Sequence, residues 1–108
     1  MTKTYTRHTS HAAQVLGHQV AAGRRRRRWT IDALANRANV SAPTVRKVEK
    51  GDPSVALGTA FDLAVLVGVP LFAEDAAGLA GLAGRLEDRI AVLPRRVDVD
   101  DSGLDDDF

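Results

Sequence analysis

The stretch WTIDALANRANVSAPTVRKVEKG, residues 29–51, decides the fold. Thr30 is a favoured N-cap residue, and Asp32 follows it in the first turn, where a carboxylate meets the positive end of the helix dipole. Apolar residues at helical spacing then predict one buried stripe, made of Ile31, Leu34, Ala35 and Ala38. Asn39 tolerates the left-handed conformation that ends a helix tightly. A short helix between Thr30 and Asn39 is therefore predicted.

A second short helix follows almost at once. Ser41 can cap it, and Pro43 falls in its first turn, where a missing N–H costs nothing. Val45 and Val48 form its inward pair, and Gly51 is a good terminator. Two short helices joined by a tight turn, with a basic second helix, are typical of a helix-turn-helix motif.

The chain before this motif predicts an arm and one more helix. Residues 1–9 are polar without periodicity and are expected to form a flexible N-terminal arm. Ser10 can cap a first helix whose apolar residues Val15, Leu16 and Val20 share one side. That helix should end around the five consecutive arginines at residues 24–28.

Two further helices are predicted after the motif. Ser54 can cap the first of them, residues 55–67, which is apolar nearly all round and should be buried on more than one side, one of them against a second subunit. The second, within residues 74–94, carries a seam of Leu79, Leu82, Leu86, Ile90 and Leu93. Residues 95–108 form an acidic tail, too poor in apolar side chains to fold alone. We predict an all-α, five-helix chain: a helix-turn-helix domain of four helices over residues 10–73, a dimerisation helix within residues 74–94 and a disordered tail.

Charge is divided unevenly along the chain. Residues 1–51 hold eleven basic and two acidic side chains, a formal charge of +9, and residues 52–108 hold four and twelve, a charge of −8. The basic half indicates a polyanionic partner. The 108 residues contain no cysteine, no run of about 18 apolar residues and no signal pattern, so a soluble cytoplasmic protein is expected, with no membrane partner.

Catalysis is not expected. The sequence offers no nucleophile paired with a base and no phosphate-binding Gly-rich loop, and no cofactor is predicted. His8, His11 and His18 lack an acidic or thiol companion and are interpreted as surface residues, so no metal is predicted.

Residues 29–51 resemble the XRE family, the lambda-repressor-like helix-turn-helix regulators. The similarity rests on Thr30, Leu34-Ala35, Ala38, Val40-Ser41, Thr44-Val45, Val48-Glu49 and Gly51, and it extends over residues 10–72. Ile31 departs from the family, which often has a phosphate-binding glutamine there, and Pro43 is also less usual. A narrower resemblance links the arginine run, residues 69–72, residues 93–96 and the Asp-Asp-Asp-Phe ending to HipB-type antitoxins, which partner a HipA-like kinase toxin.

The resemblance and the charge together predict a DNA-binding surface. Base contacts are expected from the outward side of the second motif helix, at Ala42, Thr44, Arg46 and Lys47. Phosphate contacts are expected from Thr30, Ser41, Lys50, Arg26, Arg27, Arg28 and Arg37. For Arg46 and Lys47 a phosphate-only role stays open, as does a purely solubilising role for the arginine run. Trp29 should pack between the first two helices.

The tail allows three interpretations. Its end, Asp105, Asp106, Asp107 and Phe108, could bind a basic groove on a kinase toxin; the tail could instead fold back on the arginines or only add solubility. We predict a homodimeric repressor that binds a palindromic operator and acts as an autoregulating antitoxin. A module that chiefly neutralises a toxin, and an XRE regulator without one, remain alternatives.

Overall fold

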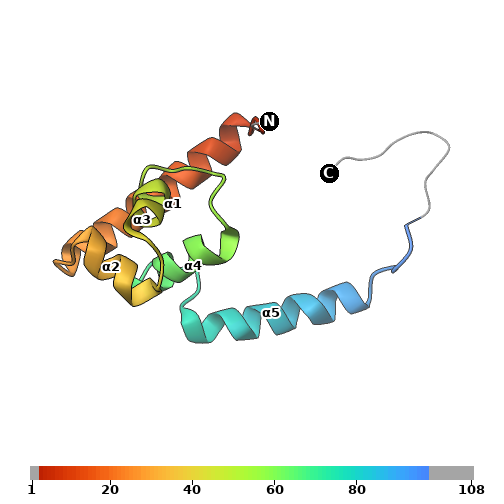
Figure 1. The fold of residues 1–108 in the computed structure, drawn as a ribbon. Coiled ribbons are helices and arrows are strands. Elements are labelled where there is room, and N and C mark those ends of the chain that lie inside the picture. Colours follow the sequence, from red (N-terminus) through yellow and green to blue (C-terminus); the bar gives the residue numbers. More distant parts are fainter. Residues whose placement is uncertain (1–2, 98–108) are drawn as a thin grey trace. The chain divides into compact units, whose positions relative to one another are not determined.

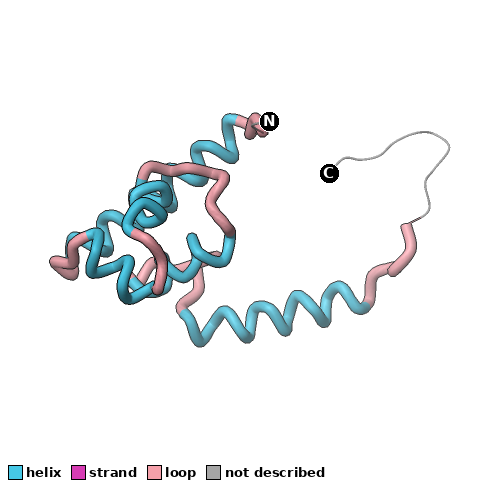
Figure 2. Tube along the Cα trace, viewed as in Figure 1, coloured by secondary structure: helices cyan, strands magenta, loops and turns pink. Residues whose placement is uncertain are grey.

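The computed structural model describes residues 3–97 (Figure 1). Regular structure in this part of the chain consists of five helices: α1 Arg7–Arg26, α2 Ile31–Ala38, α3 Ala42–Glu49, α4 Leu57–Leu66 and α5 Ala76–Ala91. Figure 2 shows these helices joined by loops, and between residues 3 and 97 the β structure is a single bridge from Leu71 to Glu74. The predicted all-α class is confirmed. One compact unit reaches to Ala76 and contains α1 to α4, and α5 belongs to a second.

The side-chain caps of α2 and α3 form as predicted. Thr30 Oγ1 accepts a hydrogen bond from the Ala33 N–H at 3.0 Å, and Ser41 Oγ accepts one from the Thr44 N–H at 3.2 Å. Asn39 takes the left-handed conformation, with φ of 56°, and ends α2. Each cap satisfies a backbone group that the helix leaves without an internal partner. Local chemistry therefore fixes both ends of the turn between α2 and α3.

Helix α1 begins earlier than the sequence suggested. Its N-cap is Thr6, whose Oγ1 accepts from the Thr9 N–H at 3.1 Å, so the helix starts three residues before Ser10. The stretch predicted as a flexible arm thus includes the first turn of α1. The end of the helix agrees with the prediction, because α1 stops within the arginine run, with Arg27 as its C-cap.

The predicted start of α4 at Val55 is wrong. Ser54 does not cap the helix; its N–H and its hydroxyl both donate to Asp52 Oδ1, at 2.8 and 2.6 Å. These two bonds stabilise the carboxylate and lower the pKa of Asp52. Because Ser54 is committed to this turn, α4 begins only at Leu57, after Ala56, which offers no side-chain cap.

The core lies among α1 to α4. Helix α1 packs against α3 and α4, and α2 packs against the same two helices. The buried apolar residues are Val20, Leu34, Ala35, Val45, Val48, Leu63, Ala64, Val67, Val69 and Leu71. The predicted inward residues of α2 and α3 are confirmed for Leu34, Ala35, Val45 and Val48, whereas Ile31 and Ala38 are half-buried.

Helix α1 buries Val20 and half-buries Leu16, as predicted, but the prediction for Val15 is wrong. Val15 is 57% exposed, and the buried positions are Gly17, Val20 and Gly23. A Cβ on Gly23 would lie 2.7 Å from Val67 O, and one on Gly17 would overlap Val48 O. The two glycines let the backbone of α1 touch the backbones of its neighbours.

Helix α5 buries no residue within the single chain. It spans most of the seam predicted from the sequence, and the seam residues Leu86, Ile90 and Leu93 are exposed. Among the described residues, no helix combines the length and the hydrophobicity of a transmembrane segment. The tail residues Asp105, Asp106, Asp107 and Phe108 lie outside the described residues.

Candidate nucleic-acid interface

Helix α3 presents its basic side chains to solvent. Val45 and Val48 are buried beneath it, and Arg46 and Lys47 are exposed on the other side. Lys50, the C-cap residue, is exposed as well. The sequence prediction required this exposure, and the structure provides it.

The first turn of α3 is held by hydroxyl groups. Ser41 Oγ and Thr44 Oγ1 lie 2.8 Å apart, and the same Ser41 oxygen accepts from the Thr44 N–H. Ser41 and Pro43 are exposed, whereas Ala42 and Thr44 are half-buried. The N-terminal end of α3 can therefore offer small side chains and a hydroxyl to a ligand. Thr30 is likewise exposed at the start of α2.

The other end of α3 is fixed by an ion pair that links it to α1. Arg24 Nε and Nη2 donate to the two carboxylate oxygens of Glu49, at 2.7 and 3.0 Å. The two side chains are only 11% and 10% exposed. Arg24 Nη1 also donates to the backbone carbonyl of Trp29 at 2.9 Å, so one guanidinium joins α1, α3 and the loop before α2.

The ion pair affects the protonation of Arg24. The hydrogen bonds that Arg24 donates to Glu49 raise the pKa of Arg24, burial opposes this, and the Coulomb attraction of Glu49 adds to the rise. The pair with Glu49 therefore favours the charged form of Arg24. The sequence analysis did not find this pair, since the partners are 25 positions apart.

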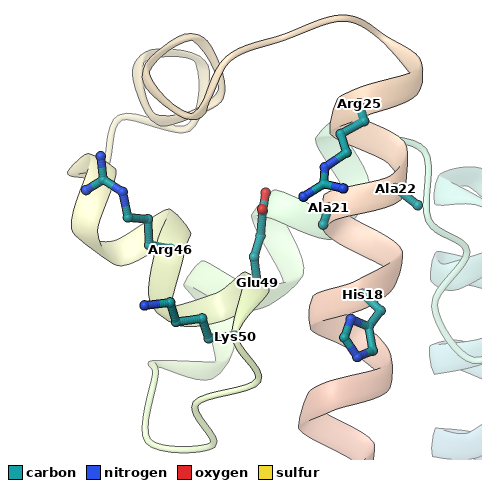
Figure 3. A pocket seen from close by; sticks show the side chains of 7 residues that line it. All are labelled: His18, Ala21, Ala22, Arg25, Arg46, Glu49 and Lys50. Atoms are coloured by element: carbon teal, nitrogen blue, oxygen red, sulfur yellow. The ribbon is translucent and has the colours of Figure 1, made fainter.

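A groove of about 450 Å³ runs between α1 and α3 (Figure 3). Its lining residues are His18, Ala21, Ala22, Arg25, Arg46, Glu49 and Lys50. Arg25 and Glu49 point into the space between the helices, and Arg46 and Lys50 extend from α3 away from α1 (Figure 3). Three basic side chains thus border one groove. Arg25 was not singled out by the sequence analysis.

The arginine run separates into two groups. Arg24 and Arg27 hold the fold: Arg27 Nη1 donates to Val67 O at 2.5 Å and to Gly23 O at 3.4 Å. Arg25, Arg26 and Arg28 are exposed. Residues three apart share a helix face, which explains why Arg24 and Arg27 behave alike. Of the predicted phosphate ligands, Arg26, Arg27 and Arg28 are all exposed, and Arg27 in addition donates hydrogen bonds to backbone carbonyls of the protein.

Trp29 lies half-buried between two guanidinium groups. The Arg37 Cζ atom is 4.1 Å from the centre of the indole ring and the Arg27 Cζ atom is 5.7 Å from it. Arg27 ends α1 and Arg37 belongs to α2, so Trp29 packs between these helices, as predicted. Both arginines gain a cation–π contact there. Arg37, a predicted phosphate ligand, is therefore partly engaged with the indole.

The chain matches a known domain family over much of its length. The model of a helix-turn-helix domain matches residues 15–77, which include α2, the turn and α3. The chain belongs to this helix-turn-helix family. It is accordingly a DNA-binding regulator, of a family that is typically not enzymatic. No curated protein and no solved structure matches the chain.

Proposed function

We propose that this helix-turn-helix protein is a sequence-specific transcriptional repressor of the XRE, lambda-repressor-like type. Helix α3 would enter the major groove with Arg46 and Lys47 at base edges and Ala42 and Thr44 near its N-terminal end. Thr30, Ser41 and Lys50 would bind phosphates on either side.

One observation carries the proposal. Helix α3 buries Val45 and Val48 and leaves Arg46, Lys47 and Lys50 exposed, while the Arg24–Glu49 pair holds its C-terminal end. An arginine on such a helix can donate two hydrogen bonds to guanine O6 and N7, which is the commonest specific contact in the major groove.

Replacing Arg46 by alanine is expected to weaken binding to the preferred DNA site by about 1–3 kcal/mol and to relax the preference at one base position. The site would be selected from a random duplex library by the unmodified protein, and affinities measured by fluorescence anisotropy at fixed salt. Random duplex DNA is the matched control. Equal weakening on both DNAs would assign Arg46 to a phosphate instead.

The exposed arginines are expected to set the salt dependence of binding. Changing Arg25, Arg26 and Arg28 to glutamine should reduce the slope of log affinity against log salt by about 0.9 for each phosphate that the protein no longer neutralises. The thermal midpoint should hardly change, because these side chains are exposed.

Arg27→Gln is the control from the same run. It removes the hydrogen bond to Val67 O, so the thermal midpoint should fall while the salt slope stays close to that of the unmodified protein. A triple variant with an unchanged slope would assign Arg25, Arg26 and Arg28 to solvent. A reduced slope in Arg27→Gln alone would place the phosphate contacts on the other arginine face.

We further propose that the repressor is a homodimer with contacts from α4 and α5. Leu57 and Val65 of α4 are exposed apolar residues, and α5 buries nothing within one chain. Two copies would place their α3 helices roughly 34 Å apart, one turn of duplex, and so bind a palindromic operator.

An antitoxin role is the finer form of this proposal. The resemblance to HipB-type proteins and the acidic ending Asp105, Asp106, Asp107 and Phe108 support a HipA-like kinase as partner. Binding of such a kinase by the full chain and by a 1–94 truncation tests it. Equal binding by both would remove the tail from the contact, and no binding by either would leave an XRE regulator without a toxin.

A further inference from the structure

All the large apolar residues of α5 lie on one narrow face. Leu79, Leu82, Leu86 and Ile90 fall within about 40° of the direction of Leu86 when successive residues turn by about 100°. Leu86 is 45% exposed and Ile90 is 65% exposed. Leu93, 59% exposed, extends the face beyond the helix end, where its N–H donates to Ile90 O at 2.9 Å. We call these five residues the α5 seam.

The spacing of the α5 seam suits a long, straight helix pair. The steps of three, four, four and three residues bring the pattern back after eleven residues, a period of about 3.67 residues per turn. A straight α-helix has about 3.6 residues per turn, so the seam stays in line over its length. The opposite side carries small or charged residues, Ala77, Gly84 and Asp88, and offers no large apolar side chain. The seam is therefore the face of α5 that suits packing against a partner.

The charges beside the α5 seam select the partner and its direction. Arg85 and Arg89 lie about 100° and 60° to one side of Leu86, and Glu87 lies about 100° to the other side. In an antiparallel two-fold pair, each side of one helix meets the same side of its copy, which sets arginines against arginines. In a parallel two-fold pair, opposite sides meet, which sets Glu87 beside Arg89 of the second copy, twice. A second copy in parallel orientation is thus electrostatically complementary.

We propose that α5 pairs with α5 of a second copy as a parallel, in-register two-helix coil along the α5 seam. The inference rests on the homodimer proposed above and adds its partner surface, direction and register. Leu86 of each copy lies at the middle of the seam, and each Glu87 faces Arg89 of the other copy. The α5 seam, exposed at Leu86, Ile90 and Leu93 and half-buried at Leu79 and Leu82 in the single chain, becomes the dimer core.

Engineered disulfides in the full chain test the direction. The chain has no cysteine, so Leu82→Cys and Ile90→Cys each introduce one thiol. A parallel in-register pair brings each thiol next to its own copy, and both variants should cross-link under mild oxidation. An antiparallel pair centred on Leu86 separates the two copies of either position by roughly 12 Å, beyond the ~7 Å that a disulfide allows between Cα atoms. Ala80→Cys, on the opposite side of α5, is the matched control and should stay uncross-linked.

The outcomes separate orientation, pairing and DNA binding. Cross-linking only in a mixture of the Leu82→Cys and Ile90→Cys proteins would overturn the parallel direction. A chain that is monomeric by light scattering, or that cross-links equally through Ala80→Cys, would overturn the α5 pairing. The affinity of the same proteins for DNA is measured in a separate experiment and shows independently whether the repressor proposal stands.

A charge exchange gives a second readout that spares the apolar seam. Glu87→Arg should raise the dimer dissociation constant about three- to tenfold, because two attractions become repulsions. Adding Arg89→Glu should restore the dissociation constant. A Glu87→Arg variant that dimerises unchanged, or a double variant no better than the single one, would contradict the proposed pairing.

Discussion

Replacing Gly17 by alanine is expected to lower the free energy of unfolding by about 2–4 kcal/mol. Where α1 crosses the end of α3, a Cβ at this position would overlap Val48 O and lie 2.8 Å from Glu49 O. Both obstacles are backbone atoms, which cannot rotate away as a side chain would. The helix propensity of alanine returns only about 1 kcal/mol of the loss.

At Gly17, α1 cannot easily move away from α3 to make room for a Cβ. The next turn of the chain is equally close: a Cβ on Gly51, whose φ is 80°, would lie 2.8 Å from the Gln14 Cα. Moving α1 away from α3 would also stretch the Arg24–Glu49 hydrogen bonds, which are 2.7 and 3.0 Å long. The added methyl group would therefore strain the contacts between α1 and α3, which set the orientation of α3.

Gly84→Ala is the matched control for Gly17→Ala. It makes the same chemical change inside a helix, where a Cβ meets nothing within 4 Å, so α5 should gain about 1 kcal/mol of helix propensity. Thermal unfolding followed by circular dichroism compares the two variants. For a domain of this size, the loss in Gly17→Ala corresponds to a fall of the midpoint by about 10–20 °C. A Gly17→Ala protein as stable as the unmodified chain would show that the close crossing of α1 and α3 does not form.

The turn between α2 and α3 could be predicted because its determinants are local. Thr30 and Ser41 each accept a hydrogen bond from a backbone N–H three residues away, and Asn39 adopts the left-handed conformation that asparagine tolerates better than most residues. Such interactions depend on a few neighbouring residues, so they can be predicted from a short stretch of sequence. The same reasoning failed at Ser54, where Asp52 competes successfully for the hydroxyl.

Hydrophobicity predicted the buried face of α1 only in part: it identified Val20 and missed both glycines. A search for apolar periodicity gives weight to Val15 and none to Gly17 or Gly23, yet the glycines are buried and Val15 is exposed. A helix face that packs backbone against backbone needs residues with small side chains. Hydrophobic periodicity does not record the size of a side chain. The spacing of Gly17, Val20 and Gly23, at every third residue, is the signal that could have revealed this face.

The division of the arginine run also depended on distant residues. In the sequence the five arginines look alike, but Arg24 is bound by Glu49 and Arg27 by the carbonyl of Val67. These partners lie 25 and 40 positions away. The three-dimensional fold, and not local composition, thus decides which cations remain for DNA.

Glu49→Gln is expected to cost about 3 kcal/mol of unfolding free energy, because it leaves the nearly buried charge of Arg24 without a counterion. Arg24→Met should cost at least as much, since it also removes the bond to Trp29 O. In the double variant the losses should not add, and a double-mutant cycle should return a coupling energy of about 2 kcal/mol. Chemical denaturation of the four proteins measures it, and purely additive losses would show that the pair makes no net contribution.

DNA binding by the Glu49→Gln variant distinguishes two roles of Glu49: fixing the position of α3 and adding a negative charge. Glu49 lies three residues after Arg46, and its loss makes the surface of α3 more positive, which favours any duplex. If Glu49 positions α3, binding to random DNA should hold or rise while binding to the selected site falls, because α3 no longer has a fixed orientation. An equal rise on both DNAs would mean that Glu49 acts only as a negative charge. The affinities for random DNA and for the selected site are measured at low temperature, where the variant stays folded despite its lower stability.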